Sequence, residues 1–351
     1  MNIFKRNISF KKNLKVDLLH CDKVIGNLKL KNISQNFLDQ NELNLRYLII
    51  GFFKFLFIRK RNITLSDFYF IEMIKSYSPK VVLGHDMTGI TFRVKKLIPK
   101  LSTITYQLAF IFKNDENYYK NNFQNKSTDI YLVYDKRSKE MMQKYVKAKY
   151  KIFGSVKSSF TKLLKKNKII KYDLLYISPF RSINLRTKNN IRQNNNERKY
   201  LRCVKDYCFK NKKKICIALS SNRKDKKNIN KNDEKKFYKS IIPFVHFEDK
   251  QSINLVRKSN VIISSLSNLG YELLMKREKV LFLTNDKEKF KFFESSKLPF
   301  VYYVNNAKNI KVKINKLISL KKNQWNNILD RYTNSKNCEK KLKLLVTNYA
   351  K

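Results

Sequence analysis

The chain has 351 residues, 42% hydrophobic and 13% aromatic, so its composition excludes a disordered protein and favours two folded domains. Lys and Arg number 77 against 27 Asp and Glu, a formal net charge of +50. This charge would attract polyanions such as nucleic acid, anionic lipid headgroups or nucleotide phosphates. Lys, Asn and Ile are abundant together, however, so the bias of an AT-rich genome explains the charge equally well.

Apolar strand-like runs alternate with helical patterns, which predicts βαβ units around a parallel sheet. In the first half, helical patterns are ITLSDFYFIEMIKSYSP and KRSKEMMQKYV. The predicted strands there cover residues 15–19, 80–84, 102–106, 129–134 and 150–154. We therefore expect a Rossmann-like domain over residues 1–156.

The longest apolar run, residues 47–58, contains Lys54 and is shorter than the roughly 20 residues that span a bilayer. It predicts a buried helix or strand, with contact to a membrane interface as the alternative. Residues 1–17 contain no apolar core of signal-peptide length. The five Cys show no C-x-x-C spacing, which favours a reducing compartment. We expect a cytoplasmic protein.

The pattern weakens over residues 157–200, where KNNIRQNNNERK is polar enough for an exposed connection and residues 176–180 form at most a short strand. A second Rossmann-like domain is predicted over residues 201–308, followed by helices over 309–351. Its strands are predicted at residues 214–220, 244–249, 260–264, 279–283 and 300–304. The predicted fold class is α/β, with two Rossmann-like domains facing across a cleft.

One of only six glycines lies in the stretch NVIISSLSNLGYELL, residues 260–274. A strand ending at Ser264 enters a polar turn, Ser265 to Asn268, and then a helix that carries Gly270 and Glu272. A helix amino terminus of this kind binds anions, so a diphosphate would fit the turn and Glu272, one helical turn later, could accept ribose hydroxyls. Gly270 would allow a close approach to a ligand or to the neighbouring strand. An ordinary capped helix has the same pattern.

The stretch resembles the donor-site segment of GT-B glycosyltransferases of bacterial surface carbohydrate biosynthesis, which build capsule or lipopolysaccharide. Ser264, Ser267, Gly270 and Glu272 match the pattern S-x-x-S-x-x-G-x-E, and KVLFL follows as the next strand. The resemblance implies GT-B architecture, with the donor phosphates at Ser265, Ser267 and Asn268 and the donor ribose at Glu272.

Other segments extend this resemblance. IALSSNR and NDEKKFYKSII resemble the first strand of the carboxy-terminal domain, its phosphate-side loop and the next helix, which places Ser220 and Arg223 near the donor. Arg223 could pair with a diphosphate or be one solvated charge in a basic run. His246, near the end of another strand, would also face the donor. SYSPKVVLGHDMTG and YKIFGSVKSS resemble segments of the acceptor-side domain, where Gln107 alone matches a Q-N-G motif.

Glycosyl transfer needs a base for the acceptor hydroxyl. His85 and Asp86, at the end of the predicted strand KVVLG, are the catalytic candidates, although Asp86 could instead cap a helix near Met87 and His85 could be a packed side chain. His20, just past the first strand, ranks below them. No D-x-D motif follows a strand, so we expect metal-independent transfer and no cofactor beyond the nucleotide-sugar substrate.

The leading hypothesis is a glycosyltransferase that moves a sugar from a nucleotide-sugar donor to a growing surface polysaccharide or lipid-linked acceptor. A lipid-linked acceptor would place it peripherally at the anionic inner face of the cell membrane. A nucleotide-sugar epimerase or polyol-phosphate transferase would share the scaffold. A nucleic-acid-binding protein is less favoured, because Lys is spread over the whole chain and no zinc-finger spacing or RNP-like motif occurs.

Overall fold

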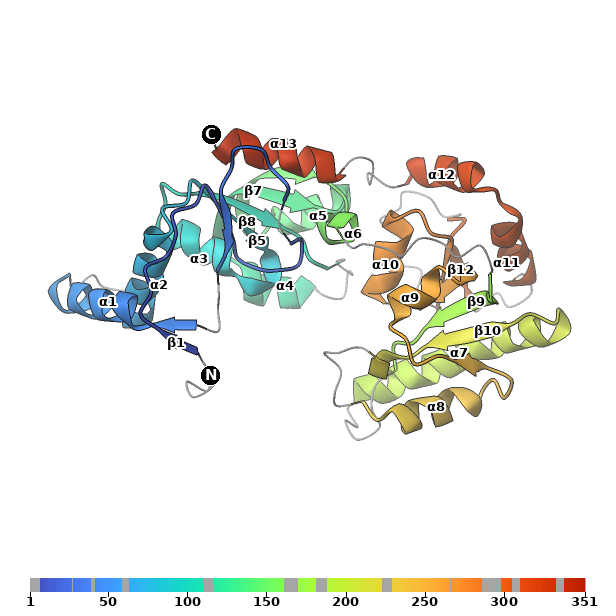
Figure 1. Cartoon of the computed structure of the whole chain (residues 1–351). Coiled ribbons are helices and arrows are strands. Elements are labelled where there is room, and N and C mark those ends of the chain that lie inside the picture. The colour runs from blue at the N-terminus through green and yellow to red at the C-terminus, as the bar shows by residue number, and fades with distance from the viewer. Residues whose placement is uncertain are drawn as a thin grey trace. The chain divides into compact units, whose positions relative to one another are not determined.

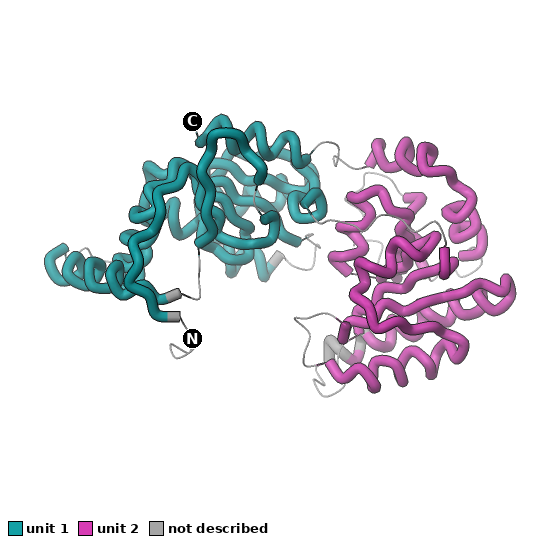
Figure 2. The backbone as a smooth tube through the Cα atoms, in the orientation of Figure 1, with its two compact units in different colours: residues 1–160, 334–351 teal, residues 161–333 magenta. Residues whose placement is uncertain are grey.

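The computed structural model describes most of the chain, and its ranges are residues 7–26, 28–38, 42–58, 63–109, 116–160, 170–180, 188–222, 229–265, 267–285, 298–304, 310–332 and 338–350. The chain divides into two compact units, residues 1–160 with 334–351 (unit 1) and residues 161–333 (unit 2). Figure 2 shows them in teal and magenta. Each unit contains a six-stranded sheet in which every pair of neighbouring strands is parallel.

The sheet of unit 1 has the order β3-β2-β5-β6-β7-β8. The chain runs from β2 outward to β3 and returns on the other side of β2 to β5, so the strand order reverses between β2 and β5. Val, Ile and Leu dominate the inner strands because helices cover both faces of a parallel sheet. The strands are β2 (Leu18–His20), β3 (Gln35–Phe37), β5 (Val81–His85), β6 (Ser102–Tyr106), β7 (Lys126–Val133) and β8 (Val146–Ile152).

Helix α13 (Cys338–Ala350) returns from the far end of the chain to cover the sheet of unit 1 (Figure 1). Leu342 and Val346 are fully buried there, in one apolar cluster with Leu18 and Val81. Residues 309–351 were predicted to form one group of helices, but the structure divides them between the two units. The other helices of unit 1 are α2 (Leu65–Ser76), η2 (Asp86–Thr88), α3 (Ile90–Leu97), α4 (Glu116–Phe123), α5 (Lys136–Met142) and α6 (Val156–Phe160).

The apolar run at residues 47–58 forms helix α1 (Leu45–Phe57), which follows a small parallel sheet of β1 (Asn7–Ser9) and β4 (Glu42–Asn44). Only Tyr47 and Gly51 of this helix are buried. The prediction of a buried element is therefore wrong for most of α1. The physical reason is that α1 contacts α2 along one stripe, while the opposite side has no covering element within the described residues.

The sheet of unit 2 has the order β11-β10-β9-β12-β13-β14, which reverses between β9 and β12. Its strands are β9 (Tyr172–Ile177), β10 (Ile215–Ala218), β11 (His246–Phe247), β12 (Ser259–Ser264), β13 (Val280–Thr284) and β14 (Val301–Tyr303). Its helices are α7 (Lys188–Lys210), η4 (Ser220–Asn222), α8 (Lys231–Lys239), α9 (Ser252–Val256), α10 (Asn268–Met275), α11 (Ile310–Ser319) and α12 (Lys322–Asp330).

Residues 157–200 differ most from the expected connection. They contain β9, a central strand of the sheet, and the first half of α7, a helix of 23 residues. The polar composition of its first half concealed this helix. Its buried side carries only apolar residues from Leu201 onward, and one turn earlier the buried residue is a charged one, Glu197. The segment EKFKFFESS, residues 288–296, whose sequence predicts a helix, lies outside the described residues.

Candidate functional site

Polar side chains gather where the strand order of each sheet reverses. In an open parallel sheet, ligands bind outside the carboxyl ends of the strands at this reversal point. In unit 2 these ends are Ser178 after β9 and Ser265 after β12, and in unit 1 they are Asp22 after β2 and His85 at the end of β5. The predicted donor turn and the predicted base therefore each lie at a reversal point.

The turn between β12 and α10 is held by its own serines. Ser264 Oγ accepts a hydrogen bond from the Ser267 amide at 3.3 Å, and Ser267 Oγ accepts one from the Leu269 amide at 3.2 Å, as the N-cap of α10. Asn268, the first residue of the helix, is exposed. Glu272 follows one turn later with only 6% of its surface exposed. The predicted turn, cap and acidic residue thus lie together at one end of a short helix.

Gly270 lies against the neighbouring strands. A Cβ atom at this position would be 2.6 Å from Ser264 Oγ, 2.8 Å from Ser264 Cβ and 3.0 Å from Phe282 Cε1. Atoms that are not bonded do not approach this closely without repulsion. The absence of a side chain therefore allows α10 to begin directly on β12 and β13.

A buried carboxylate on α8, Glu234, fixes the loop after β10. Its oxygens accept the Ser220 amide at 2.8 Å, the Ser221 amide at 2.9 Å and the hydroxyl of Ser178. Ser220 Oγ in turn donates to the Ser178 carbonyl at 2.6 Å. Ser220, predicted to bind the donor, thus uses its side chain and its amide to shape the loop. Arg223 lies outside the described residues.

A second buried carboxylate, Glu197 of α7, lies behind the Ser265 turn. It accepts a hydrogen bond from the Tyr176 hydroxyl. Burial raises the pKa of Glu197 to about 7, although the neighbouring Ser265 and Tyr176 side chains lower it. Its hydrogen bond joins α7 to the central strand β9.

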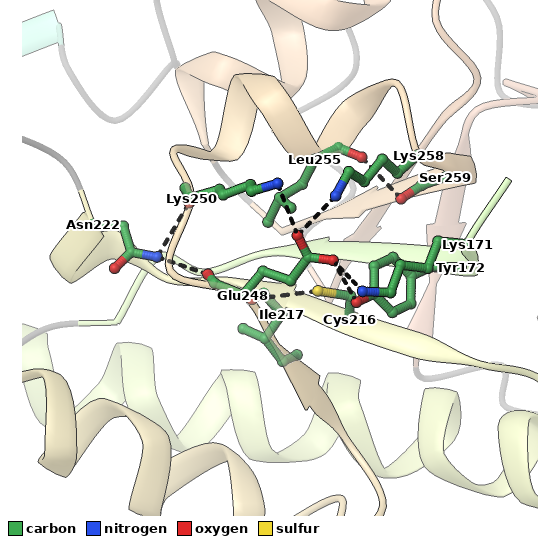
Figure 3. Close-up of polar contacts among 10 residues, drawn as sticks. All are labelled: Lys171, Tyr172, Cys216, Ile217, Asn222, Glu248, Lys250, Leu255, Lys258 and Ser259. Carbon is green, nitrogen blue, oxygen red and sulfur yellow. Dashed lines mark hydrogen bonds and ion pairs between the residues drawn. The ribbon is translucent and has the colours of Figure 1, made fainter. Parts of the chain in front are cut away.

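His246 lies apart from the donor turn, on the edge strand β11, with β10 and β9 between it and β12. Its imidazole is exposed and its ring centroid is 5.8 Å from that of Tyr172. Figure 3 shows the polar cluster that follows it, in which Glu248 accepts hydrogen bonds from Lys171 at 2.7 Å and Lys258 at 2.9 Å. Partial burial opposes the effect, but these two lysines and the Tyr172 hydroxyl hold the pKa of Glu248 at about 2.

In unit 1, Asp22 organises the reversal point. Its carboxylate accepts the His85 amide at 2.9 Å, the Tyr106 hydroxyl at 2.7 Å and the Val24 amide at 2.9 Å. These bonds fix the ends of β2, β5 and β6 together. The His85 side chain lies beside the Tyr106 ring, 6.0 Å between centroids, with 9% of its surface exposed.

The surroundings of the His85 ring lower its pKa, which favours the neutral form. Burial lowers its pKa, the negative charge of Asp22 opposes this, and the positive charge of Lys157 adds to it. Its Nδ1 atom is buried and has no hydrogen-bond partner among the described residues. A neutral imidazole with a spare nitrogen can accept a proton.

Asp86 is buried, with 3% of its surface exposed. Its carboxylate accepts the Tyr131 hydroxyl at 2.8 Å and the Leu108 amide at 3.1 Å. Burial raises its pKa to about 6, against the lowering effect of these hydrogen bonds. Asp86 also begins the short helix η2, but its side chain connects the end of β5 to residues after β6 and within β7.

Gln107 and His20 have structural partners. Gln107 is buried; its Oε1 accepts the Tyr134 amide at 3.0 Å and its Nε2 donates to the Ala109 carbonyl at 2.8 Å. The amide therefore shapes the loop after β6, and its acceptor-side role stays a prediction. His20 Nε2 is 3.1 Å from Gln35 Oε1, on the neighbouring strand.

Sequence reasoning missed three carboxylates that organise these sites: Asp22, Glu197 and Glu234. Asp22 had a usable signal, since it follows the first strand directly and strand ends carry ligand-site residues in this class of fold. Glu197 and Glu234 lie inside helices with many polar neighbours, so the sequence predicts that they face solvent. Among the described residues, no group of three or more His, Cys, Asp or Glu side chains could hold a metal ion.

No protein-family model and no curated protein matches the sequence. Solved structures are similar in fold. A protein of Listeria monocytogenes assigned as a UDP-N-acetylglucosamine 2-epimerase aligns with a TM-score of 0.60 and 13% identity over 96% of this chain and 97% of that one. The UDP-GlcNAc 2-epimerase of Neisseria meningitidis, bound to UDP-GlcNAc, aligns with a TM-score of 0.55 and 14% identity over 93% and 98%.

The pneumococcal O-GlcNAc transferase, in complex with UDP and GlcNAc, aligns with a TM-score of 0.50 and 12% identity over 81% of this chain and 60% of that one. At these identities the likeness concerns the fold. The predicted α/β class with two Rossmann-like domains is confirmed, and the chain has the GT-B fold.

Proposed function

We propose that this protein is a nucleotide-sugar-dependent glycosyltransferase of GT-B fold that works at the inner face of the cell membrane and extends a surface polysaccharide or a lipid-linked acceptor. One observation carries the proposal. The Ser264–Glu272 segment, which resembles a donor site in sequence, lies at the strand-order reversal of a parallel sheet, where this class of fold binds ligands. The capping of α10 uses contacts within the segment itself, so capping alone does not explain why the segment lies at the strand-order reversal.

The donor would bind to unit 2. Its diphosphate would lie at the amino terminus of α10, where the helix dipole and the amides around Ser267 and Asn268 favour negative charge. Glu272, one turn along the helix, would accept hydroxyl hydrogens of the ribose. Arg223 would neutralise the diphosphate, in keeping with the resemblance that places it in the phosphate-side loop.

The acceptor would meet its base in unit 1. The acceptor hydroxyl attacks the anomeric carbon, the bond from this carbon to the diphosphate oxygen breaks, and the hydroxyl proton passes to the base. His85 is supported as that base by its neutral ring and the free Nδ1 among the described residues. Asp86, whose pKa is raised to about 6 by burial, would be the second proton-transfer group.

A nucleotide-sugar epimerase is the second candidate. Two observations favour it: the fold neighbours that align over nearly their whole length are 2-epimerases, and in unit 1 two carboxylates, Asp22 and Asp86, lie with His85 at the carboxyl ends of adjacent strands. Epimerisation inverts a carbon that carries hydrogen, so it needs proton removal and return, which such a cluster can provide.

A donor panel separates the candidates. Purified protein is first screened by thermal shift with UDP, GDP, CDP, CMP and their sugars, together with Glu272→Gln and the control Asp249→Asn, which removes an exposed carboxylate of the same unit. We expect one nucleotide to stabilise wild-type protein and the control but not Glu272→Gln. No stabilisation by any nucleotide would contradict the proposal.

Product analysis with the stabilising donor then follows. A glycosyltransferase releases nucleotide only when an acceptor saccharide is present. An epimerase changes the configuration of the donor sugar with no acceptor, which NMR detects. A changed donor sugar without acceptor would replace the first candidate by the second.

A further inference from the structure

Helix α1 has apolar residues on two opposite sides, but only one side is covered. On the covered side it contacts α2 so closely that a Cβ on Gly51 would lie 2.8 Å from the Tyr69 amide nitrogen. Lys54 pairs with Glu72 of α2 at 2.8 Å beside this contact. Figure 1 shows α1 next to α2 at the edge of unit 1, extending away from the sheet.

The outward side of α1 is a continuous apolar surface. At 100° per residue, Ile49, Phe52, Phe53 and Leu56 fall within an arc of about 100°, with Phe57 beside it. Their exposed fractions are 47%, 45%, 53% and 49%, and 83% for Phe57. A helix on the surface of a soluble domain normally carries polar residues on this side. A clustered apolar surface of this kind marks an interaction site.

The segment after β1, residues 10–15, lies at the start of α1. The Asn13 amide donates to the Tyr47 hydroxyl at 2.9 Å, and Asn44 Nδ2 donates to the Lys11 carbonyl at 2.7 Å, so residues 11–13 lie against the start of α1. Phe10 and Leu14 are 62% and 76% exposed. They alternate with exposed lysines, which are Lys11, Lys12 and Lys15.

Charge identifies the occupant of this surface. Residues 45–61, LRYLIIGFFKFLFIRKR, contain Arg and Lys but no Asp or Glu, and residues 10–15, FKKNLK, contain three more lysines. An anionic surface complements this charge, whereas a second copy of the chain would bring the same positive charge. Thirteen residues make a helix about 20 Å long, less than the roughly 30 Å of a bilayer core. No described helix is long and apolar enough to cross a membrane.

We propose that the outward side of α1 is a docking surface that inserts into the interface of an anionic membrane. The aromatic and aliphatic side chains enter the headgroup boundary, and the exposed Arg46 and the lysines of residues 10–15 contact acidic lipid. This inference does not depend on the identity of the donor. On the proposed function, it assigns to unit 1 the surface that holds the protein at the membrane.

Vesicle sedimentation tests the proposal. The full chain is mixed with vesicles of equal parts phosphatidylcholine and phosphatidylglycerol, or of phosphatidylcholine alone, over a salt series. Phe53→Ser with Leu56→Ser removes two outward side chains. The matched control, Phe209→Ser with Leu344→Ser, removes one Phe and one Leu that are 73% and 64% exposed elsewhere. Phe52→Ser with Phe57→Ser is a second variant of the same surface.

We expect wild-type protein and the control to bind the anionic vesicles equally. We expect each α1 variant to bind at least about tenfold more weakly, because two large apolar side chains no longer leave water. Equal binding of the α1 variants, or no binding of wild-type protein, would overturn the proposal. A lipid-free dimer that the α1 variants dissociate would assign the surface to a second copy instead. We expect nucleotide to raise the melting temperature of both α1 variants as much as that of the wild type. Such a result would show that the α1 variants lose membrane binding while the donor site stays intact.

Discussion

Substitution of Gly270 by Ala tests how closely α10 must approach the sheet. The new methyl group would meet Ser264 Oγ at 2.6 Å, Ser264 Cβ at 2.8 Å and Phe282 Cε1 at 3.0 Å. Overpacking of this kind costs about 1–3 kcal/mol, while Ala in place of Gly returns up to about 1 kcal/mol of helix propensity. We expect a net loss of about 1–2 kcal/mol and a melting temperature lower by roughly 2–8 °C.

A double-mutant cycle identifies the contact responsible. Ser264→Gly removes two of the three crowded atoms, so Gly270→Ala should cost about 1 kcal/mol less in the Ser264→Gly background than in the wild type. Urea denaturation of the four proteins measures this coupling. If Gly270→Ala leaves the urea midpoint unchanged or raises it, then α10 has room to move away from β12 and the close-approach argument is refuted.

Three further predictions concern a second glycine, a buried carboxylate and a helix cap. Gly51→Ala should lower the unfolding free energy by more than Gly270→Ala, by above about 2 kcal/mol in urea denaturation, because its methyl group meets the backbone of Tyr69, which cannot rotate away. Equal urea midpoints for the two variants would contradict this. Asp86→Asn keeps the shape of the side chain but cannot titrate. The unfolding free energy of the wild type minus that of this variant should fall by up to about 3 kcal/mol as the pH rises from 4 to 7. If this difference does not change with pH, the pKa of Asp86 is not raised. Ser267→Ala should lower stability by about 1 kcal/mol in thermal melts, since the Leu269 amide loses its acceptor, and a wild-type melt would show that the cap does not matter.

The direction of the pH effect at Asp86 follows from its two pKa values. The group has a pKa of about 6 in the folded protein and 3.8 as the ordinary value. Between these values the folded state binds more protons than the unfolded state, so stability falls as pH rises. The contribution is fully present below pH 3.8 and is lost as pH passes through about 6. Other titrating groups are common to both proteins and cancel in the difference.

The strands of both sheets could be predicted because a parallel strand is buried on both faces. The run Val261–Ile263 in β12 and the run Val81–Leu83 in β5 have no solvent side, so their composition alone indicates them. The ends of these strands then locate the reversal points. This is why the sequence led to Ser264 and His85 without knowledge of the strand order.

Long-range packing could not be predicted in the same way. Helix α7 is polar in its first half, and its burial depends on Glu197 meeting Tyr176 of a strand that precedes it. Helix α1 has the composition of a core helix, yet its environment depends on which elements cover it. Asp22 acts on His85 and Tyr106, which are far away along the chain. Patterns within one segment contain no information on such partners.

The return of α13 to unit 1 affects the order in which the two units can mature during synthesis. Leu342 and Val346 complete a cluster with Leu18 and Val81, but the ribosome makes them after all of unit 2. Unit 2 is continuous along the chain, so it can close its own core as soon as it emerges. Unit 1, although synthesised first, keeps part of its apolar sheet uncovered until α13 arrives, which makes a late helix the step that finishes the earliest domain.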